Sequence, residues 1–173
     1  MLIYFAKGVT IKDKLAYLAL DKLPNKTTVL IFISLFALYH LIDSWLAQYS
    51  SDSIPEIILE LISTTNFIFI ACFTTVVTVP IIEEVIFRGF LFKAVQTSKY
   101  GAIGAILITS LLFTLMHAYQ YDPLDLIGLF ISALILGYAR FMSNSLYLPI
   151  LLHMLQNLIA TIFLVDYIKN IPV

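Results

Sequence analysis

Long apolar segments alternate with short polar ones along most of the chain. An apolar run of about 20 residues matches a helix that crosses the hydrocarbon core of a bilayer. The second segment is about 40 residues long, twice what one crossing needs, and it contains Pro80, where we expect a kink. The five predicted spans are Thr28–Gln48, Ile57–Val95, Gly101–Ala118, Leu124–Phe141 and Leu146–Val165.

The segment before the first predicted span has a different pattern. Ile11, Leu15 and Leu18 share one helical face, whereas Lys12 and Lys14 lie off that face. This arrangement is typical of a helix that lies in the membrane interface. The lysines fall within and after the apolar stretch rather than before it, which argues against a signal peptide.

Composition and charge narrow the class of protein. The chain of 173 residues is 61% hydrophobic and 12% charged, whereas a soluble domain is roughly half apolar and a quarter charged. A net charge of −1 provides no basic surface for nucleic acid, and a single cysteine excludes an internal disulfide framework. The sequence predicts an all-α, polytopic membrane helix bundle, with about five transmembrane helices and an N-terminal interfacial helix, forming one domain over residues 1–173.

The charges between the spans predict an orientation. Lysines precede the first span and follow the second, and Arg140 is assigned to the connection between the fourth and fifth. The other connections carry mainly aspartate and glutamate. Because basic loops remain in the cytoplasm, we expect a multi-pass protein of the cell membrane, with a cytoplasmic N-terminus and an extracytoplasmic C-terminus.

Several polar side chains lie inside the predicted spans. An ionisable group there costs about 3 kcal/mol to insert and usually serves a function. Glu84 and Arg88 are four residues apart and can pair on one helical face, which leaves Glu83 free for chemistry. Helix rise places four of these residues at depths where they can meet in one intramembrane cavity, expected to open to the cytoplasm. The four residues are Glu83, His117, His153 and Asn157.

Three sequence strings contain these residues in order. Residues 80–89 read PIIEEVIFRG, residues 113–117 read FTLMH, and residues 153–157 read HMLQN. They resemble the EExxxR, FxxxH and HxxxN motifs of the CPBP family, which comprises CAAX proteases and bacteriocin-processing enzymes and is also called the Abi family. The resemblance covers residues 60–165 approximately.

This resemblance implies an intramembrane endopeptidase of the glutamate type. Glu83 would activate a water molecule, and His117 would hold and polarise that water. His153 and Asn157 would form the oxyanion hole, and Glu84 with Arg88 would support the site. No cofactor or metal is expected. The expected partners are the lipid bilayer and a peptide or membrane-protein substrate, such as a bacteriocin leader or a pheromone precursor.

Other interpretations use the same residues. A non-catalytic membrane protein could confer bacteriocin self-immunity by binding a peptide. An ion or proton transporter also needs buried carboxylates, but no inverted repeat is visible and Pro80 is the only clear helix break. Two histidines with carboxylates could bind zinc, although the sequence has no HExxH spacing. Each polar pair could also serve only as a contact between helices.

Two further features of the spans are assigned to structure. His40 and Asp43 are three residues apart on the first span and could pair, but no motif surrounds them. Small residues on the fourth span predict close packing of helices, namely Gly128, Ser132, Ala133 and Gly137.

Overall fold

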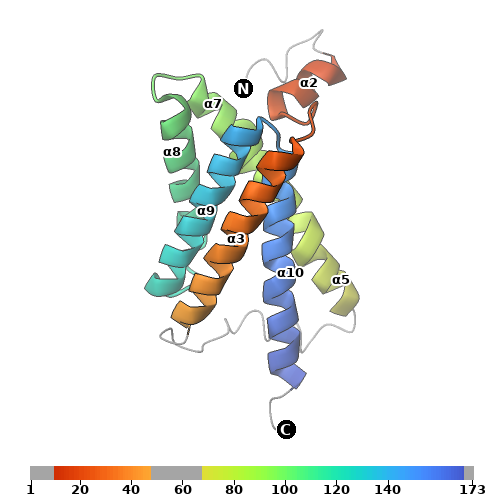
Figure 1. Ribbon diagram of the computed structural model, residues 1–173, viewed down its shortest axis with the longest axis vertical. Coiled ribbons are helices and arrows are strands. Elements are labelled where there is room, and N and C mark those ends of the chain that lie inside the picture. Colours follow the sequence, from red (N-terminus) through yellow and green to blue (C-terminus); the bar gives the residue numbers. More distant parts are fainter. Residues whose placement is uncertain (1–9, 48–67, 170–173) are drawn as a thin grey trace.

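The computed structural model describes residues 10–47 and 68–169, and every regular element within those ranges is a helix (Figure 1). The elements from α5 to α7 follow one another without interruption and form one long helix that includes two π-helical segments. The elements are α2 (Ile11–Leu18), α3 (Lys26–Ala47), α5 (Ile68–Phe73), η1 (Thr74–Thr78), α6 (Val79–Glu84), η2 (Val85–Leu91), α7 (Phe92–Gln96), α8 (Gly101–Met116), α9 (Pro123–Ser143) and α10 (Tyr147–Lys169).

Hydropathy and length identify the helices that can cross a membrane. Within the described residues, four are long and apolar enough: Lys26–Trp45, Phe69–Gln96, Pro123–Ser143 and Tyr147–Asp166. The apolar helix α8 has 16 residues, about 24 Å of rise, and is shorter than the hydrocarbon core of about 30 Å. The all-α membrane bundle is therefore confirmed, and its third predicted span is a shorter helix. The predicted start of the second span, 57–67, lies outside the described residues.

Pro80 lies inside the long helix rather than at a break in it. In the π-helical segment before it, the N–H of Val79 donates to the carbonyl of Thr74. The same register would pair the carbonyl of Thr75 with residue 80, whose proline nitrogen has no hydrogen. The helix thus continues through Pro80 with one wide turn, and the carbonyl of Thr75 needs a donor from another element.

A helix, α2, is confirmed where the sequence predicts an interfacial one, and its position in the membrane interface stays a prediction. Its N-terminus has a capping box, in which Thr10 and Asp13 exchange hydrogen bonds between side chain and backbone. Its C-terminus turns at Ala19, which has φ +58°, and the carbonyl of Ala19 accepts from the backbone N–H of Leu146 at 2.8 Å. The hydroxyl of Ser145 donates to the carbonyl of Lys22 at 2.7 Å. These bonds fasten α2 and its connection to the α9–α10 turn.

Most of the described lysines lie at one end of the bundle. Helix α2, the start of α3, helix α7 and the α9–α10 turn lie together at the upper end in Figure 1. The elements at this end carry Lys12, Lys14, Lys26 and Lys93, whereas α9 begins at the opposite end with Asp125 in its first turn. The sequence placed Arg140 in a connection, and this is wrong. Arg140 lies in the last turn of α9 and is buried.

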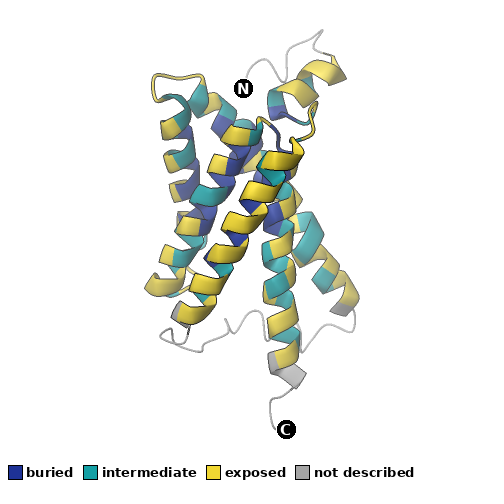
Figure 2. Cartoon of the chain, in the orientation of Figure 1, coloured by how far each residue is buried: buried dark blue, intermediate teal, exposed yellow. Residues whose placement is uncertain are grey.

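Helix α9 is the centre of the packing. A cluster of buried side chains joins it to α3 and α10, and the buried residues gather in the upper half of the bundle (Figure 2). A Cβ at residue 128 would meet Asp43 of α3, and a Cβ at residue 137 would meet Ile106 of α8. The close packing predicted from the small residues of this helix is confirmed, because these glycines face two different neighbours.

Candidate active site

Three predicted site residues from separate helices come together around one carboxyl group. Nε2 of His117, the residue that ends α8, lies 3.8 Å from Oε1 of Glu83. Nε2 of His153, on α10, lies 3.6 Å from Oε2 of the same carboxyl. The side chain of Glu83 is 21% exposed and that of His117 is 17% exposed, so both remain within reach of a small molecule. The predicted meeting of these three residues is confirmed.

The partner of each histidine's Nδ1 atom shows which ring nitrogen carries the proton. Nδ1 of His117 lies 2.8 Å from the carbonyl of Phe113, and a carbonyl can only accept. Nδ1 of His153 lies 3.0 Å from Oε1 of Glu84, and a carboxylate also accepts. Both Nδ1 atoms are therefore assigned a hydrogen, and in a neutral ring Nε2 is left with a lone pair that faces Glu83.

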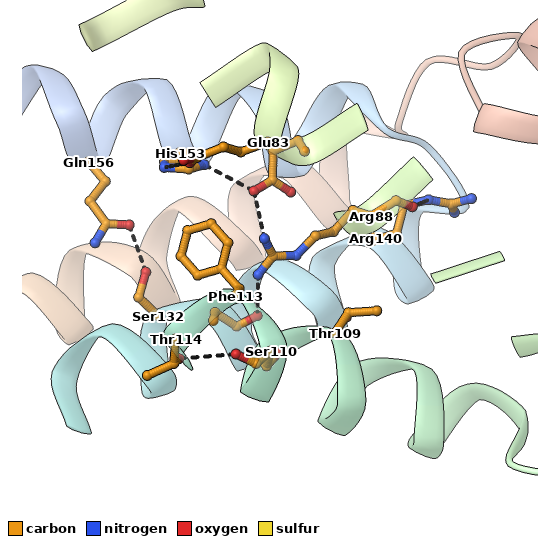
Figure 3. A network of polar contacts seen from close by, with 12 residues as sticks. Glu83, Arg88, Thr109, Ser110, Phe113, Thr114, Ser132, Arg140, His153 and Gln156 are labelled. Atoms are coloured by element: carbon orange, nitrogen blue, oxygen red, sulfur yellow. Dashed lines mark hydrogen bonds and ion pairs between the residues drawn. The ribbon is translucent and has the colours of Figure 1, made fainter. Parts of the chain in front are cut away.

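The Glu84–Arg88 pair predicted from the spacing is present and fully buried. Nη1 of Arg88 lies 2.9 Å from Oε1 of Glu84, and neither side chain is exposed. Nη2 of Arg88 donates to the carbonyl of Ala133 on α9 at 3.0 Å, and Figure 3 shows Arg88 among its polar contacts from close by. Oε1 of Glu84 thus joins Arg88 to His153, and this pair connects α6, η2, α9 and α10.

Buried side chains close the site toward the end of the bundle that carries the lysines. Nε of Arg140 donates to the carbonyl of Arg88 at 3.0 Å, and its guanidinium lies 5.4 Å from the ring centre of Phe92. Phe92 is 0% exposed. The cavity around Glu83 was expected to open toward this end, where the described side chains of Arg88, Phe92 and Arg140 are buried.

Asn157 has a different neighbour from the other predicted site residues. It follows His153 by one turn of α10, and its Nδ2 donates to the carbonyl of Thr75 at 2.9 Å. That carbonyl is the one left without a backbone donor by Pro80. Asn157 therefore joins α10 to the long helix one turn below the Glu83 cluster, and the structure does not place it against Glu83.

Two aromatic residues contribute to the site in ways the motifs do not indicate. The ring of Phe113 packs 4.7 Å from the ring of His117, 5.7 Å from that of His153 and 4.7 Å from the guanidinium carbon of Arg88. The ring of Tyr121, in the α8–α9 connection, lies 6.2 Å from that of His117. Burial, followed by the negative charges of Asp125 and Glu83, raises the pKa of the Tyr121 hydroxyl. A tyrosine near a span end resembles an interfacial anchor, so its contact with His117 could not be predicted from the sequence pattern.

Among residues 10–47 and 68–169, no group of three histidine, cysteine, aspartate or glutamate side chains is arranged to hold a metal ion. The Nε2 atoms of His117 and His153 do not bond directly to Glu83. Separations of 3.6 and 3.8 Å are too long for direct hydrogen bonds and fit groups bridged by one small polar molecule.

The chain is similar to known proteins. The family described as type II CAAX prenyl endopeptidase, Rce1-like, matches residues 64–159, a range that contains all six predicted site residues. A protein of Escherichia coli described as an uncharacterized 24.3 kDa protein is 34% identical over 117 residues, which cover 66% of this chain and 48% of that protein. The chain thus spans about half the length of this relative. No solved structure matches this chain.

Proposed function

The chain belongs to the type II CAAX prenyl endopeptidase family, Rce1-like, and we propose that it hydrolyses a peptide bond in a membrane or leader peptide, with Glu83 as the base that activates water. One observation carries the proposal: the two carboxyl oxygens of Glu83 face the Nε2 atoms of His117 and His153. A carboxylate flanked by two such nitrogens can hold a water molecule in a fixed direction. The family is one of membrane endopeptidases, and the four apolar helices agree with it.

The first step is attack by water on the peptide carbonyl. Glu83 takes one proton from the water, and the water oxygen forms a bond to the carbonyl carbon. His117 orients that water through the lone pair of Nε2, because its Nδ1–H is held by the carbonyl of Phe113 at 2.8 Å. Glu83 then passes the proton to the leaving amine as the C–N bond breaks. The products are a free carboxyl terminus and a free amino terminus.

The oxyanion is assigned to His153 and Asn157. The Nδ1–H of His153 donates to Oε1 of Glu84 at 3.0 Å. In this role, unlike in the neutral ring described above, His153 carries a proton on Nε2 as well, and that Nε2–H donates to the oxyanion. Asn157 donates one amide hydrogen to Thr75 and has a second one for substrate. Glu84 and Arg88 then act as positioning residues, since they touch His153 rather than the reacting atoms.

No metal or other cofactor is part of this proposal. The mechanism needs only a base, an orienting nitrogen and oxyanion donors, and the proposal assigns these roles to Glu83, His117, His153 and Asn157. If the histidine nitrogens held a zinc ion instead of orienting water, removal of that ion by a chelator would abolish cleavage. We expect cleavage by the purified protein to continue in the presence of a strong chelator, measured with the same peptides as below.

The test of the function is peptide cleavage by the purified protein and its Glu83→Gln variant. Both are incubated with a mixture of membrane and leader peptides, and new termini are identified by mass spectrometry. We expect the variant to lose about 10²- to 10⁴-fold in rate, as for removal of a general base. His40→Gln is the matched control, because it changes the chain's remaining histidine and leaves the cluster intact. Equal cleavage by Glu83→Gln and wild type would contradict the proposal.

The same variant separates hydrolysis from the immunity interpretation. A protein that gives immunity only by binding a bacteriocin would protect cells equally well with Glu83→Gln. A protease would lose protection together with cleavage. A survival assay with both variants, at matched amounts of protein in the membrane, therefore distinguishes the two functions.

A further inference from the structure

A groove between α3 and α9 lies apart from the Glu83 cluster and shares no lining residue with it. It encloses about 300 Å³, at the lower end of the range for small-molecule sites. Seven of its lining side chains are aliphatic, and the other lining residues are Tyr39, Asp43, Asp125 and Gly128. A groove of this composition suits a ligand that is mostly hydrocarbon.

The charged groups of the groove lie at one of its ends. Asp43 is near the end of α3, and Asp125 is in the first turn of α9; these helix ends lie together at the lower side of the bundle in Figure 1. The aliphatic lining continues along α9 as far as Ile135, about 15 Å from Asp125 toward the middle of the bundle. The groove therefore has an acidic end at the level of the lipid headgroups and an apolar body at the level of the acyl chains.

The carboxyl group of Asp43 is held in place by the packing of the two helices. A Cβ at residue 128 would lie 2.8 Å from Oδ1 of Asp43, so that glycine allows the carboxyl group to approach the backbone of α9. The hydroxyl of Tyr39 donates to the carbonyl of Gly128 at 3.1 Å and ties the helices together at this point. Asp43 is only partly exposed, unlike a freely moving surface carboxylate.

We propose that this groove binds a phospholipid with a primary ammonium headgroup. One acyl chain lies along the aliphatic lining, and the ammonium group donates to the carboxylates of Asp43 and Asp125. The ammonium group has three hydrogens to donate and complements the charge at the end of the groove. An anionic glycerol headgroup would meet two like charges at the same place. This site does not depend on the hydrolytic function proposed above.

The single tryptophan of the chain provides a readout of the lipid at this depth. Trp45 follows Asp43 by two residues on α3, about 3 Å further along the helix axis. The protein is reconstituted in phosphatidylcholine vesicles that contain brominated phosphatidylethanolamine or, at the same mole fraction, brominated phosphatidylglycerol. Bromine quenches tryptophan fluorescence at short range, so the quenching curve gives the relative affinity for each lipid. We expect about fivefold tighter binding of phosphatidylethanolamine, as for one partly exposed charge-assisted hydrogen bond.

Variants locate the source of this preference. Asp43→Asn and Asp125→Asn should each remove most of it, because each loses one carboxylate. Gly128→Ala keeps every charge but displaces the carboxyl group of Asp43, and it should also reduce the preference. Asp122→Asn is the matched control: Asp122 caps α9 through the N–H groups of Leu124 and Asp125, and asparagine caps equally well. It removes a charge at the same end without changing the groove, so the preference should remain.

Three results would overturn the proposal. Equal quenching by the two brominated lipids in wild type would show that the groove does not select an ammonium headgroup. An unchanged preference in both Asp43→Asn and Asp125→Asn would place its origin elsewhere. An equal loss in Asp122→Asn would show that the general surface charge of this end is responsible. Thermal unfolding of each variant confirms that the compared proteins are folded.

Discussion

Arg88 takes part in several of the buried polar contacts between helices. It bonds to Glu84 and to the carbonyl of Ala133, it lies over the ring of Phe113, and its own carbonyl accepts from Arg140. Its Nε and the second oxygen of Glu84 have no hydrogen-bond partner among the described residues. A buried charge pair of this kind contributes little net stability by itself, but removing one partner leaves the other charge buried and unpaired.

We therefore expect Arg88→Met to lower the free energy of unfolding by about 3–5 kcal/mol. The variant leaves Glu84 without its guanidinium and the carbonyl of Ala133 without its donor. Unfolding in detergent by a denaturant titration measures the change. Lys99→Met, which removes an exposed cation, is the control and should change the free energy by less than about 0.5 kcal/mol. A similar small change in Arg88→Met would contradict the assigned role of the pair.

Tyr121 tests whether aromatic packing holds His117 in place. If the ring alone positions the imidazole, Tyr121→Phe should cleave peptide at the wild-type rate, and Tyr121→Ala should lose about tenfold or more in kcat because a displaced catalytic group is costly. Cleavage rates are measured with the peptide found in the test of the proposed function. They show whether the ring of Tyr121 or its hydroxyl group positions His117. An equal loss in both variants would assign the effect to the hydroxyl group rather than to packing.

At the scale of the elements, the wide turn before Pro80 explains how two helices are joined near the site. Proline removes the donor that the carbonyl of Thr75 would use in the π-helical register, and Asn157 of α10 supplies another donor at 2.9 Å. The contact fixes α10 one turn from His153. This contact could not be predicted from the sequence, because the prediction would require knowing which carbonyl lacks a backbone donor and which helix lies beside that carbonyl.

Restoring a backbone N–H at residue 80 should weaken this contact. In Pro80→Ala the new N–H competes with Asn157 for the carbonyl of Thr75. Asn157→Ala should then cost about 1 kcal/mol of unfolding free energy in the wild-type background and much less in the Pro80→Ala background. A double-mutant cycle measures the difference. Equal costs in the two backgrounds would show that Pro80 and Asn157 are not coupled.

At the scale of the whole molecule, the two ends differ in charge and in packing. Most of the described lysines and most of the buried side chains are at one end (Figure 2), and Asp122 and Asp125 lie at the other, where α9 begins. The orientation expected from the positive-inside rule, with a cytoplasmic N-terminus and an extracytoplasmic C-terminus, stays a prediction.

Labelling of single cysteines tests this orientation. Cys72 is replaced by serine, and one new cysteine is introduced as Lys99→Cys or Asp122→Cys. A membrane-impermeant maleimide applied to intact cells should label the cysteine at residue 122 and should label that at residue 99 only after permeabilisation. The reverse labelling pattern would show that the orientation in the membrane is the opposite of the expected one.

Sequence reasoning was most successful where it depended on local spacing. The i, i+4 relation of Glu84 and Arg88, the face of α2 and the apolar spans follow from helix geometry alone, and the structure confirms them. The meeting of Glu83, His117 and His153 followed from helix rise together with the motifs. Arg140 was misplaced because hydropathy counts a charge near a span end as exposed, whereas α9 buries it against Phe92.

Single-turnover cleavage in ¹⁸O-labelled water tests the central claim, direct activation of water by Glu83, most directly. Enzyme in excess over peptide is allowed one turnover, and the new carboxyl terminus is weighed by mass spectrometry. If Glu83 is a base, that terminus carries ¹⁸O from the first turnover, and Glu83→Gln releases almost no product. A first-turnover product without ¹⁸O would show that an oxygen of the protein attacked the peptide, and cleavage at the wild-type rate by Glu83→Gln would exclude Glu83 as the base.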